Sequence, residues 1–200
     1  MSVKIPIKDI IAEKELKYPF DIKKIKYPLS TPSSLKYHKQ YEIHFFQKGQ
    51  GFYLINSRKY SFEKNTLIII KPNEVHKFVL KAEVEKYSIY FDLLFFEEIS
   101  NLFFSLPNKI NLTGKDAIKI EFICKTLLEE NNNKIEMYLN LIKIKLNEIF
   151  IIAYRSSANF PNLEKGGYKI QKILLFIEEN YRENLKLTEI AQKFHLSLSS

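Results

Sequence analysis

Three side chains able to bind a metal ion or a polar ligand lie in the first half of the 200-residue sequence: His38, Glu42 and His76. Imidazole nitrogens and carboxylate oxygens are donor atoms that zinc and similar divalent ions take from proteins. Lys36, two residues before His38, argues against a metal, because a protonated amine offers no lone pair and repels a cation. Three interpretations stay open here: a metal site, a polar pocket for a small ligand, and a purely structural role.

Polar and aromatic residues recur at every second position of two expected strands. They are Glu42, His44 and Phe46 in the first strand and Lys86, Ser88 and Tyr90 in the second. Alternate residues of a strand share a face, so each trio points the same way. Aromatic rings could stack on a hydroxylated ligand while lysine, histidine and glutamate bind its hydroxyl groups. The pattern favours a pocket; the alternative is that the two strands face solvent on the side that carries these residues.

The segment 21–91 consists of short apolar or alternating runs separated by turn residues. The expected strands are Ile22–Tyr27, Leu35–His38, Tyr41–Gln47, Gly51–Ile55, Lys59–Phe62, Thr66–Ile70, His76–Leu80 and Lys86–Asp92. The intervening breaks include Gly49-Gln50-Gly51, Asn56-Ser57, Lys64-Asn65 and Pro72-Asn73-Glu74, which suit hairpins and tight turns. Many short strands at this spacing predict a sandwich or a barrel.

Helical periodicity follows the strands. The expected helices are Leu94–Leu106, Asp116–Glu130 and Ile135–Arg155. The last has one apolar stripe at Ile135, Leu139, Ile142, Leu146, Ile149 and Ala153 and a roughly opposite one at Met137, Leu141, Ile144 and Ile151. A helix that is apolar on two sides needs two partners. The second partner is either another part of the same chain or the same helix of a second subunit.

The final residues have the layout of a helix-turn-helix. Thr188 is expected to cap a short helix, and Ser197 stands where a second N-cap is expected, three residues before the sequence ends. The residues assigned to this incomplete DNA-binding unit are Thr188, Ser197, Ser199 and Ser200. Because the recognition helix would follow them, we do not expect this chain alone to bind DNA specifically.

The run 170–197 resembles the opening of the AraC/XylS-type DNA-binding domain. The matching residues are Asn180-Tyr181, Leu185, Leu187, Ala191 and Leu196-Ser197. The preceding segments resemble the cupin-type sensor domain of the same family, with Gly49-x-Gly51, Pro72 and His76 in the places of its motifs. Asn65 replaces the usual glycine, which asparagine can do because it tolerates left-handed backbone angles.

This resemblance implies a mainly β fold with α: a cupin-type double-stranded β-helix barrel, a helical dimerisation region, and the first helices of a truncated helix-turn-helix domain. The expected division is an arm at 1–20 with some helical tendency at 7–16, a sensor domain at 21–93, a helical region at 94–155, a linker at 156–167, and the start of the DNA-binding domain at 168–200.

The resemblance also implies a pocket that senses a sugar or a related polar metabolite. The expected ligand-binding residues are Lys36, His38, Glu42, His44, Phe46, His76, Phe78, Lys86, Ser88 and Tyr90. Regulators of this type commonly pair through helices, which favours a homodimer with Met137, Leu141, Ile144 and Ile151 at its interface. No metal or cofactor is expected.

Composition narrows the function further. The net charge is +8, but the segment 165–200 holds six Lys or Arg against four Glu, so the excess is spread along the chain rather than gathered in a DNA-binding face. No run is apolar enough to span a membrane, no signal peptide is evident, and a single cysteine, Cys124, suits the cytoplasm. No phosphate-binding loop or Gly-x-Ser-x-Gly motif indicates an enzyme.

Two hypotheses follow. The first is a ligand-responsive transcription regulator of AraC type, which is not an enzyme and whose full-length form binds DNA. The second is a metal-dependent cupin enzyme, an oxygenase or sugar isomerase, with His38, Glu42 and His76 as ligands; in it, Glu42 lies seven residues before Gly49, which is the spacing of cupin enzymes. The start of a helix-turn-helix separates the two, because an enzyme has no use for it.

Overall fold

A computed structural model of the chain describes residues 10–12, 19–92, 106–157 and 185–197, with residues 173, 176, 177, 180 and 183 besides. The chain divides into two compact units, Met1–Asn159 and Phe160–Ser200. The expected helix at 94–106 and the expected linker at 156–167 lie almost wholly outside the described residues, as do Ser199 and Ser200.

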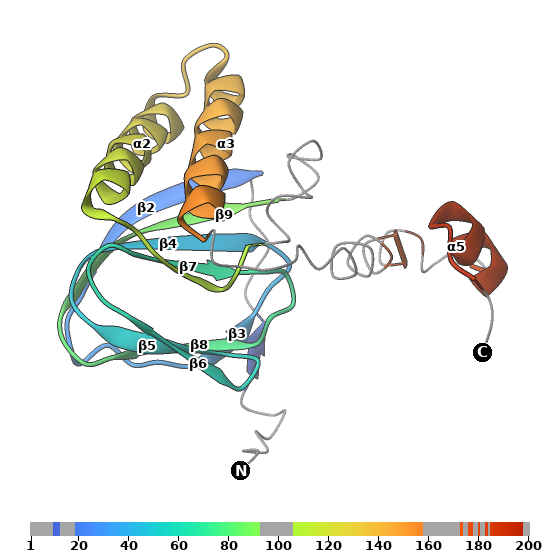
Figure 1. The fold of residues 1–200 in the computed structure, drawn as a ribbon, viewed down its shortest axis with the longest axis horizontal. Helices are drawn as coiled ribbons and strands as arrows, with labels where there is room; N and C mark the ends of the chain where they lie inside the picture. The colour runs from blue at the N-terminus through green and yellow to red at the C-terminus, as the bar shows by residue number, and fades with distance from the viewer. Residues whose placement is uncertain are drawn as a thin grey trace. The chain divides into compact units, whose positions relative to one another are not determined.

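The described part of the first unit is built on two five-stranded sheets that face one another (Figure 1). The strands are β1 (Ile10–Ala12), β2 (Phe20–Tyr27), β3 (Leu35–Tyr37), β4 (Tyr41–Lys48), β5 (Gly51–Ile55), β6 (Arg58–Phe62), β7 (Thr66–Ile70), β8 (His76–Leu80), β9 (Val84–Phe91) and β10 (Lys109–Asn111). The sheet orders are β1-β3-β8-β5-β6 and β10-β7-β4-β9-β2. Neighbouring strands are antiparallel except β1 and β3.

Turn residues set the ends of the strands, as expected from the sequence. Asn56 and Ser57 between β5 and β6 have φ values of 47° and 68°, the pair of positive angles of a two-residue hairpin turn that matches the strand twist. Asn65 has a φ of 66°, which confirms that it takes the left-handed conformation before β7. Gly49 has a φ of 93° between β4 and β5. These turns fix the register in which alternate side chains point between the sheets.

The core between the sheets is aromatic and aliphatic. Its buried members are Phe46, Tyr53, Ile55, Phe62, Ile68, Ile70 and Val84, drawn from strands of both sheets. Phe46 of one sheet stacks on Phe62 of the other, with ring centroids 3.8 Å apart. Gly51 makes room for this contact, because a Cβ there would lie 2.6 Å from the Phe62 ring.

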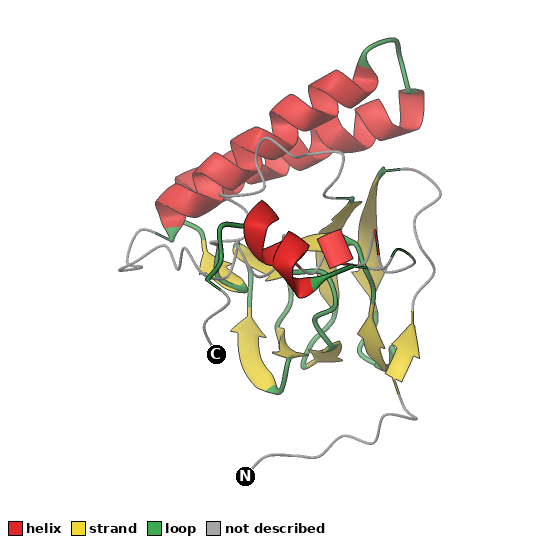
Figure 2. Ribbon diagram, turned by 90° about the vertical axis from the view of Figure 1, so that its right-hand side faces the viewer, coloured by secondary structure: helices red, strands yellow, loops and turns green. Residues whose placement is uncertain are grey.

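Two long helices cover the outer face of the sheet that contains β4 and β9 (Figures 1 and 2). α2 (Gly114–Asn133) begins at the N-cap Thr113, whose side chain accepts from the Asp116 amide, and α3 (Tyr138–Ser156) packs against it. The Phe150 ring of α3 lies 5.8 Å from that of Phe91, between centroids. None of the helices in the described residues is long and apolar enough to cross a membrane.

The apolar stripes of these helices agree with the sequence only in part. Buried residues of α3 are Ile142, Leu146, Ile149, Phe150, Ile152 and Ala153. The helix starts at Tyr138 rather than at Ile135, because Lys134 and Met137 adopt left-handed angles that no helix continues through. Met137 therefore belongs to the turn between the helices and not to the helix stripe.

Two expectations at the ends of the chain are wrong. The arm carries a short strand at Ile10–Ala12, paired with β3, where a helical tendency was expected. The short C-terminal helix α5 (Leu187–Lys193) has Lys186 rather than Thr188 as its N-cap. The Glu189 carboxylate, three residues on, accepts from the Lys186 amide, so Thr188 lies inside the first turn.

Candidate ligand-binding site

A cavity of about 110 Å³ lies between the two sheets of the first unit. A single water needs roughly 10–15 Å³ on the same measure, so this space holds a small organic molecule or several waters. Its lining is Tyr27, Thr31, Pro32, Ser33, Ser34, Lys36, Glu42, His44, Tyr53, His76, Phe78, Lys86 and Tyr90. The lining combines aromatic rings with charged and hydroxyl groups, which suits a polar ligand with flat or apolar faces.

Glu42, on β4, is the centre of the polar side chains. It is buried, and its carboxylate lies 3.0 Å from Nε2 of His38, 2.7 Å from Nε2 of His44 and 3.9 Å from Nε2 of His76. Burial alone would raise the pKa of Glu42, but the neighbouring histidines His44 and His38 outweigh it and hold the pKa well below its usual range. Glu42 is therefore a buried carboxylate that stays ionised.

His44 links this carboxylate to a buried lysine. Its Nδ1 lies 3.1 Å from Oγ of Ser88 and 3.3 Å from Nζ of Lys86, both on β9. Burial, helped by the positive charge of Lys86, lowers the pKa of His44 to about 4. The imidazole is thus neutral at pH 7, donating from Nε2 to Glu42 and accepting at Nδ1 from Lys86 or Ser88.

The ammonium of Lys86 is surrounded by aromatic rings. Its ammonium donates to the Tyr53 hydroxyl at 2.8 Å and lies 4.6 Å from the centre of the Phe78 ring. The rings of Tyr27, Phe46 and Tyr53 lie between 5.4 and 5.7 Å from it. Cation–π attraction offsets part of the cost of burying the charge. A lysine and a glutamate of opposite charge therefore line one small cavity, bridged by a neutral histidine.

The loop before β8 sets the position of His76. Glu74 accepts from the Lys71 amide and from the Asn108 side chain, each at 2.8 Å, and Asn56 accepts from the Val75 amide at 3.1 Å. Burial raises the pKa of Glu74. These contacts fix the backbone on the N-terminal side of His76, so the imidazole enters the cavity from a rigid edge of β8.

The cavity gathers most of the residues that the sequence assigned to a ligand. Seven of the ten line it: Lys36, Glu42, His44, His76, Phe78, Lys86 and Tyr90. The other three lie beside it. His38 contacts Glu42, Ser88 bonds to His44, and Phe46 belongs to the core. Their role in binding a ligand stays a prediction.

Sequence reasoning missed six lining residues. Tyr53 could have been found from the alternation of its strand. Gly51, Tyr53 and Ile55 are alternate residues of β5, and all three are buried. The others are Tyr27 and the loop residues Thr31, Pro32, Ser33 and Ser34. An irregular loop has no periodicity, so nothing in the sequence places the last four at a cavity.

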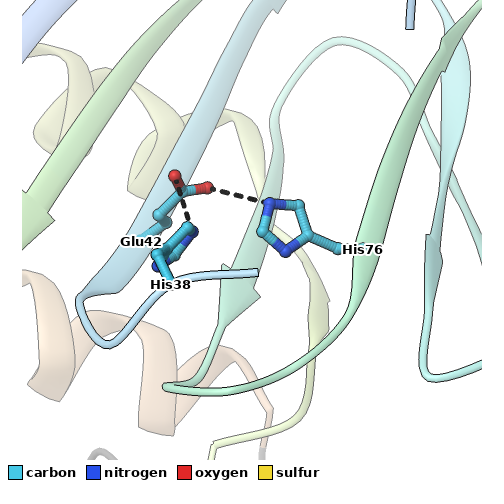
Figure 3. Close-up of side chains that lie close together, drawn as sticks. All are labelled: His38, Glu42 and His76. Carbon is cyan, nitrogen blue, oxygen red and sulfur yellow. Dashed lines mark ion pairs between the residues drawn. The ribbon is translucent and has the colours of Figure 1, made fainter. Parts of the chain in front are cut away.

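Three side chains of the site could also hold a metal ion. One ligand atom from each of His38, Glu42 and His76 lies within 4.8 Å of the others, and all three residues are buried. Figure 3 shows the carboxylate of Glu42 reached by both imidazoles. Lys36, which the sequence analysis held against a metal, lines the same cavity and is half-buried.

Fold and cavity together define a two-sheet ligand-binding domain with helices packed on one outer face. In a comparison with known protein families, residues 33–119 match the model of the AraC-like ligand binding domain. The chain is 24% identical over 176 residues to an uncharacterized HTH-type transcriptional regulator, YfiF, of Bacillus subtilis. The match covers 80% of this chain and 55% of YfiF, so the chain spans little more than half of that relative.

Solved structures of ToxT from Vibrio cholerae share the fold. The unsaturated fatty acid bound form has a TM-score of 0.52 at 12% identity, covering 92% of this chain and 72% of ToxT. The apo K231A form has a TM-score of 0.52 at 14% identity, covering 92% and 73%. The chain is thus similar to AraC-type regulators over residues 33–119, which match their ligand-binding domain.

Proposed function

We propose that this chain is the sensing part of an AraC-type transcription regulator, in which a small polar molecule occupies the cavity between the sheets and thereby controls a DNA-binding domain. The observation that carries the proposal is the cavity lined by Glu42, His76 and Lys86, inside a segment that matches the AraC-like ligand binding domain. A ligand controls such a protein only by binding one arrangement of its parts better than another.

A sugar or a related hydroxylated metabolite fits the lining best. Glu42 accepts from hydroxyl groups, Lys86 donates to them, and the Tyr27 and Phe78 rings can stack on the apolar face of a pyranose. ToxT in one of the matched structures holds an unsaturated fatty acid. A long acyl chain suits this cavity less well, because burying charged groups against hydrocarbon without hydrogen bonds costs several kcal/mol.

A thermal-shift screen of sugars and small hydroxy acids tests the proposal. A compound that binds only the folded chain, and whose free concentration is about 100 times its Kd, stabilises the chain by about 2.7 kcal/mol. We expect a shift with the native chain that is lost in Lys86→Met and retained in Lys59→Met. Lys59 is the matched control, since it is exposed and lies over the Phe52 ring, outside the cavity lining. A shift that survives Lys86→Met contradicts the assignment of the ligand to this cavity.

The helical region forms the homodimer in this proposal. Of the four interface residues expected from the sequence, Ile144 is 60% and Ile151 44% exposed on α3, Met137 is 64% exposed in the preceding turn, and Leu141 is half-buried. On α2, Ile118 and Phe122 are 72% and 66% exposed. Large apolar side chains exposed at helical spacing on both helices support a partner surface, because exposed apolar patches mark interaction sites.

The remaining divisions are part of the same proposal. The strands β3 to β9 and nearly all of β2 correspond to the cupin-type barrel at 21–93, and α2 and α3 to the dimerisation region at 94–155. The expected arm at 1–20 and the expected helical region each add one strand to the sheets, β1 and β10. After a linker at 156–167, α5 and Phe176, whose ring lies 5.7 Å from that of Phe194, belong to the start of the helix-turn-helix domain at 168–200. The full-length regulator would act on DNA in the cytoplasm.

A further inference from the structure

We propose that His38, Glu42 and His76 bind one divalent transition-metal ion at the wall of the cavity. The three residues come from separate parts of the chain: the turn after β3, the strand β4 and the first position of β8. Their side chains nevertheless converge on one point (Figure 3). The site goes beyond the proposed function, which requires no metal.

The inference depends on the hydrogen bonds that Nδ1 makes in His38 and in His76. Nδ1 of His38 lies 2.9 Å from the carbonyl oxygen of Gln40, and Nδ1 of His76 lies 2.9 Å from that of Glu74. A carbonyl oxygen only accepts, so each Nδ1 holds the ring proton. In a neutral imidazole Nε2 then carries a lone pair, and both lone pairs face the Glu42 carboxylate.

Two lone pairs and a carboxylate aimed at one point form a ligand set for a cation. Metal-binding histidines characteristically donate their other ring N–H to a backbone carbonyl or a carboxylate, which fixes the tautomer and the ring orientation. His38 and His76 both show this arrangement, and the two accepting carbonyl groups, of Gln40 and Glu74, belong to different loops.

The separations fit an ion after small movements. Ligand atoms about 2.0–2.2 Å from an ion lie about 3.0–3.5 Å from one another at adjacent coordination positions. Nε2 of His38 is 3.0 Å from a Glu42 oxygen, and Nε2 of His76 is 3.9 Å from the other oxygen. The ligand atoms all lie within 4.8 Å of one another, so they need to approach by less than about 2 Å to reach that spacing.

The donor types select the class of ion. Two imidazoles and one carboxylate suit zinc, iron, cobalt or nickel rather than calcium or magnesium, which prefer oxygen alone. His44 holds the carboxylate in place by donating to it at 2.7 Å, and its ring stands between Glu42 and the ammonium of Lys86. The ring of His44 therefore separates that ammonium from the Glu42 carboxylate.

Three protein ligands leave coordination positions open. Glu42 and His76 line the cavity, so an open position faces the space in which a small molecule would bind. An oxygen of the effector could complete the coordination. This last step rests on the proposed sensing function, whereas binding of the ion itself does not.

Cobalt binding by the untagged 200-residue chain tests the site. Protein stripped with a chelator and loaded with Co²⁺ is expected to keep one equivalent through gel filtration and to show visible d–d absorption. Glu42→Gln and His76→Gln are each expected to weaken binding at least tenfold. His195→Gln is the matched control, because His195 belongs to the second unit, whereas the remaining histidine, His44, contacts Glu42. No retained cobalt, or equal binding by the variants, overturns the proposal.

A measurement on the native chain covers the case in which a variant fails to fold. X-ray absorption of the zinc-loaded protein is expected to give two imidazoles and only nitrogen or oxygen donors. A sulfur donor would assign the ion to Cys124 and overturn the site. Failure of metal binding leaves the thermal-shift result with metal-free protein untouched, so the two proposals fail separately.

Discussion

The ammonium of Lys86 and the hydroxyl of Tyr53 join the two sheets across the cavity, with Nζ 2.8 Å from the phenolic oxygen. Lys86 belongs to β9 of one sheet and Tyr53 to β5 of the other. Both side chains are buried. The bond therefore ties the two walls of the cavity together at the place where a ligand would have to insert.

The two partners of this bond should differ in their effect on stability. Tyr53→Phe leaves a buried charge short of an acceptor and is expected to lower the free energy of unfolding by about 1–3 kcal/mol. Lys86→Met removes the charge and places a flexible apolar chain among the rings, so we expect a change within about 1 kcal/mol or a gain. Urea unfolding measures both. Adding Tyr53→Phe to Lys86→Met should then cost little; an equal cost in both backgrounds would show that the bond contributes nothing.

Glycines at the β4–β5 hairpin make a second prediction. A Cβ on Gly49 would lie 2.1 Å from the Glu83 carbonyl oxygen, and one on Gly51 would lie 2.3 Å from that of Val79. Each contact is with backbone, which cannot move aside cheaply. Gly49→Ala and Gly51→Ala should each lower the free energy of unfolding by more than about 1 kcal/mol.

Gly114→Ala is the control for these substitutions. Gly114 is the first residue of α2 and has open space around the position of a Cβ. Here alanine should be neutral or stabilise by up to about 1 kcal/mol, because it restricts the unfolded chain. Similar losses at all three glycines in chemical denaturation would contradict the steric explanation.

Strand positions were predictable where turn chemistry marks both ends. The bounds of β7 and β8 coincide with those expected from the sequence, because Asn65 and Asn73 take positive φ beside them. The convergence of Glu42, His44 and Lys86 followed from alternation alone. In contrast, β1 has three residues and gains its hydrogen bonds from β3, which lies more than twenty positions away in the sequence. No local pattern therefore predicts β1.

Helix ends were less predictable than helix faces. The apolar period runs on through Ile135 and Met137, but left-handed residues interrupt the backbone there. The exposed Ile118 and Phe122 of α2 were missed for a related reason. Periodicity identifies the face of a helix that a sheet covers. Apolar residues on the opposite face do not follow that period, so they are recognised as a surface only once the packing is known.

The thiol of the single cysteine, Cys124, should react slowly with alkylating reagents in the folded chain. Cys124 is fully buried on α2, and burial, together with the charge of Glu121, raises the pKa of its thiol. The thiolate is the reactive form, and it is scarce here and out of reach. We expect alkylation by iodoacetamide at pH 8 to be at least a hundredfold slower than in guanidinium-unfolded protein, as followed by mass spectrometry. Rapid labelling under native conditions would contradict the packing of α2.

The exposed apolar side chains of α3 should control assembly. Ile144→Glu with Ile151→Glu places two carboxylates on the surface proposed to meet a second copy, where their desolvation is costly. Sedimentation is expected to change from dimer to monomer, with an unchanged circular dichroism spectrum because both side chains are already exposed. Lys143→Glu, an exposed change of charge on the same helix, should leave the dimer intact. If the double variant sediments like the native chain, the interface lies elsewhere; the exposed pair Ile118 and Phe122 on α2 would then be the next surface to substitute.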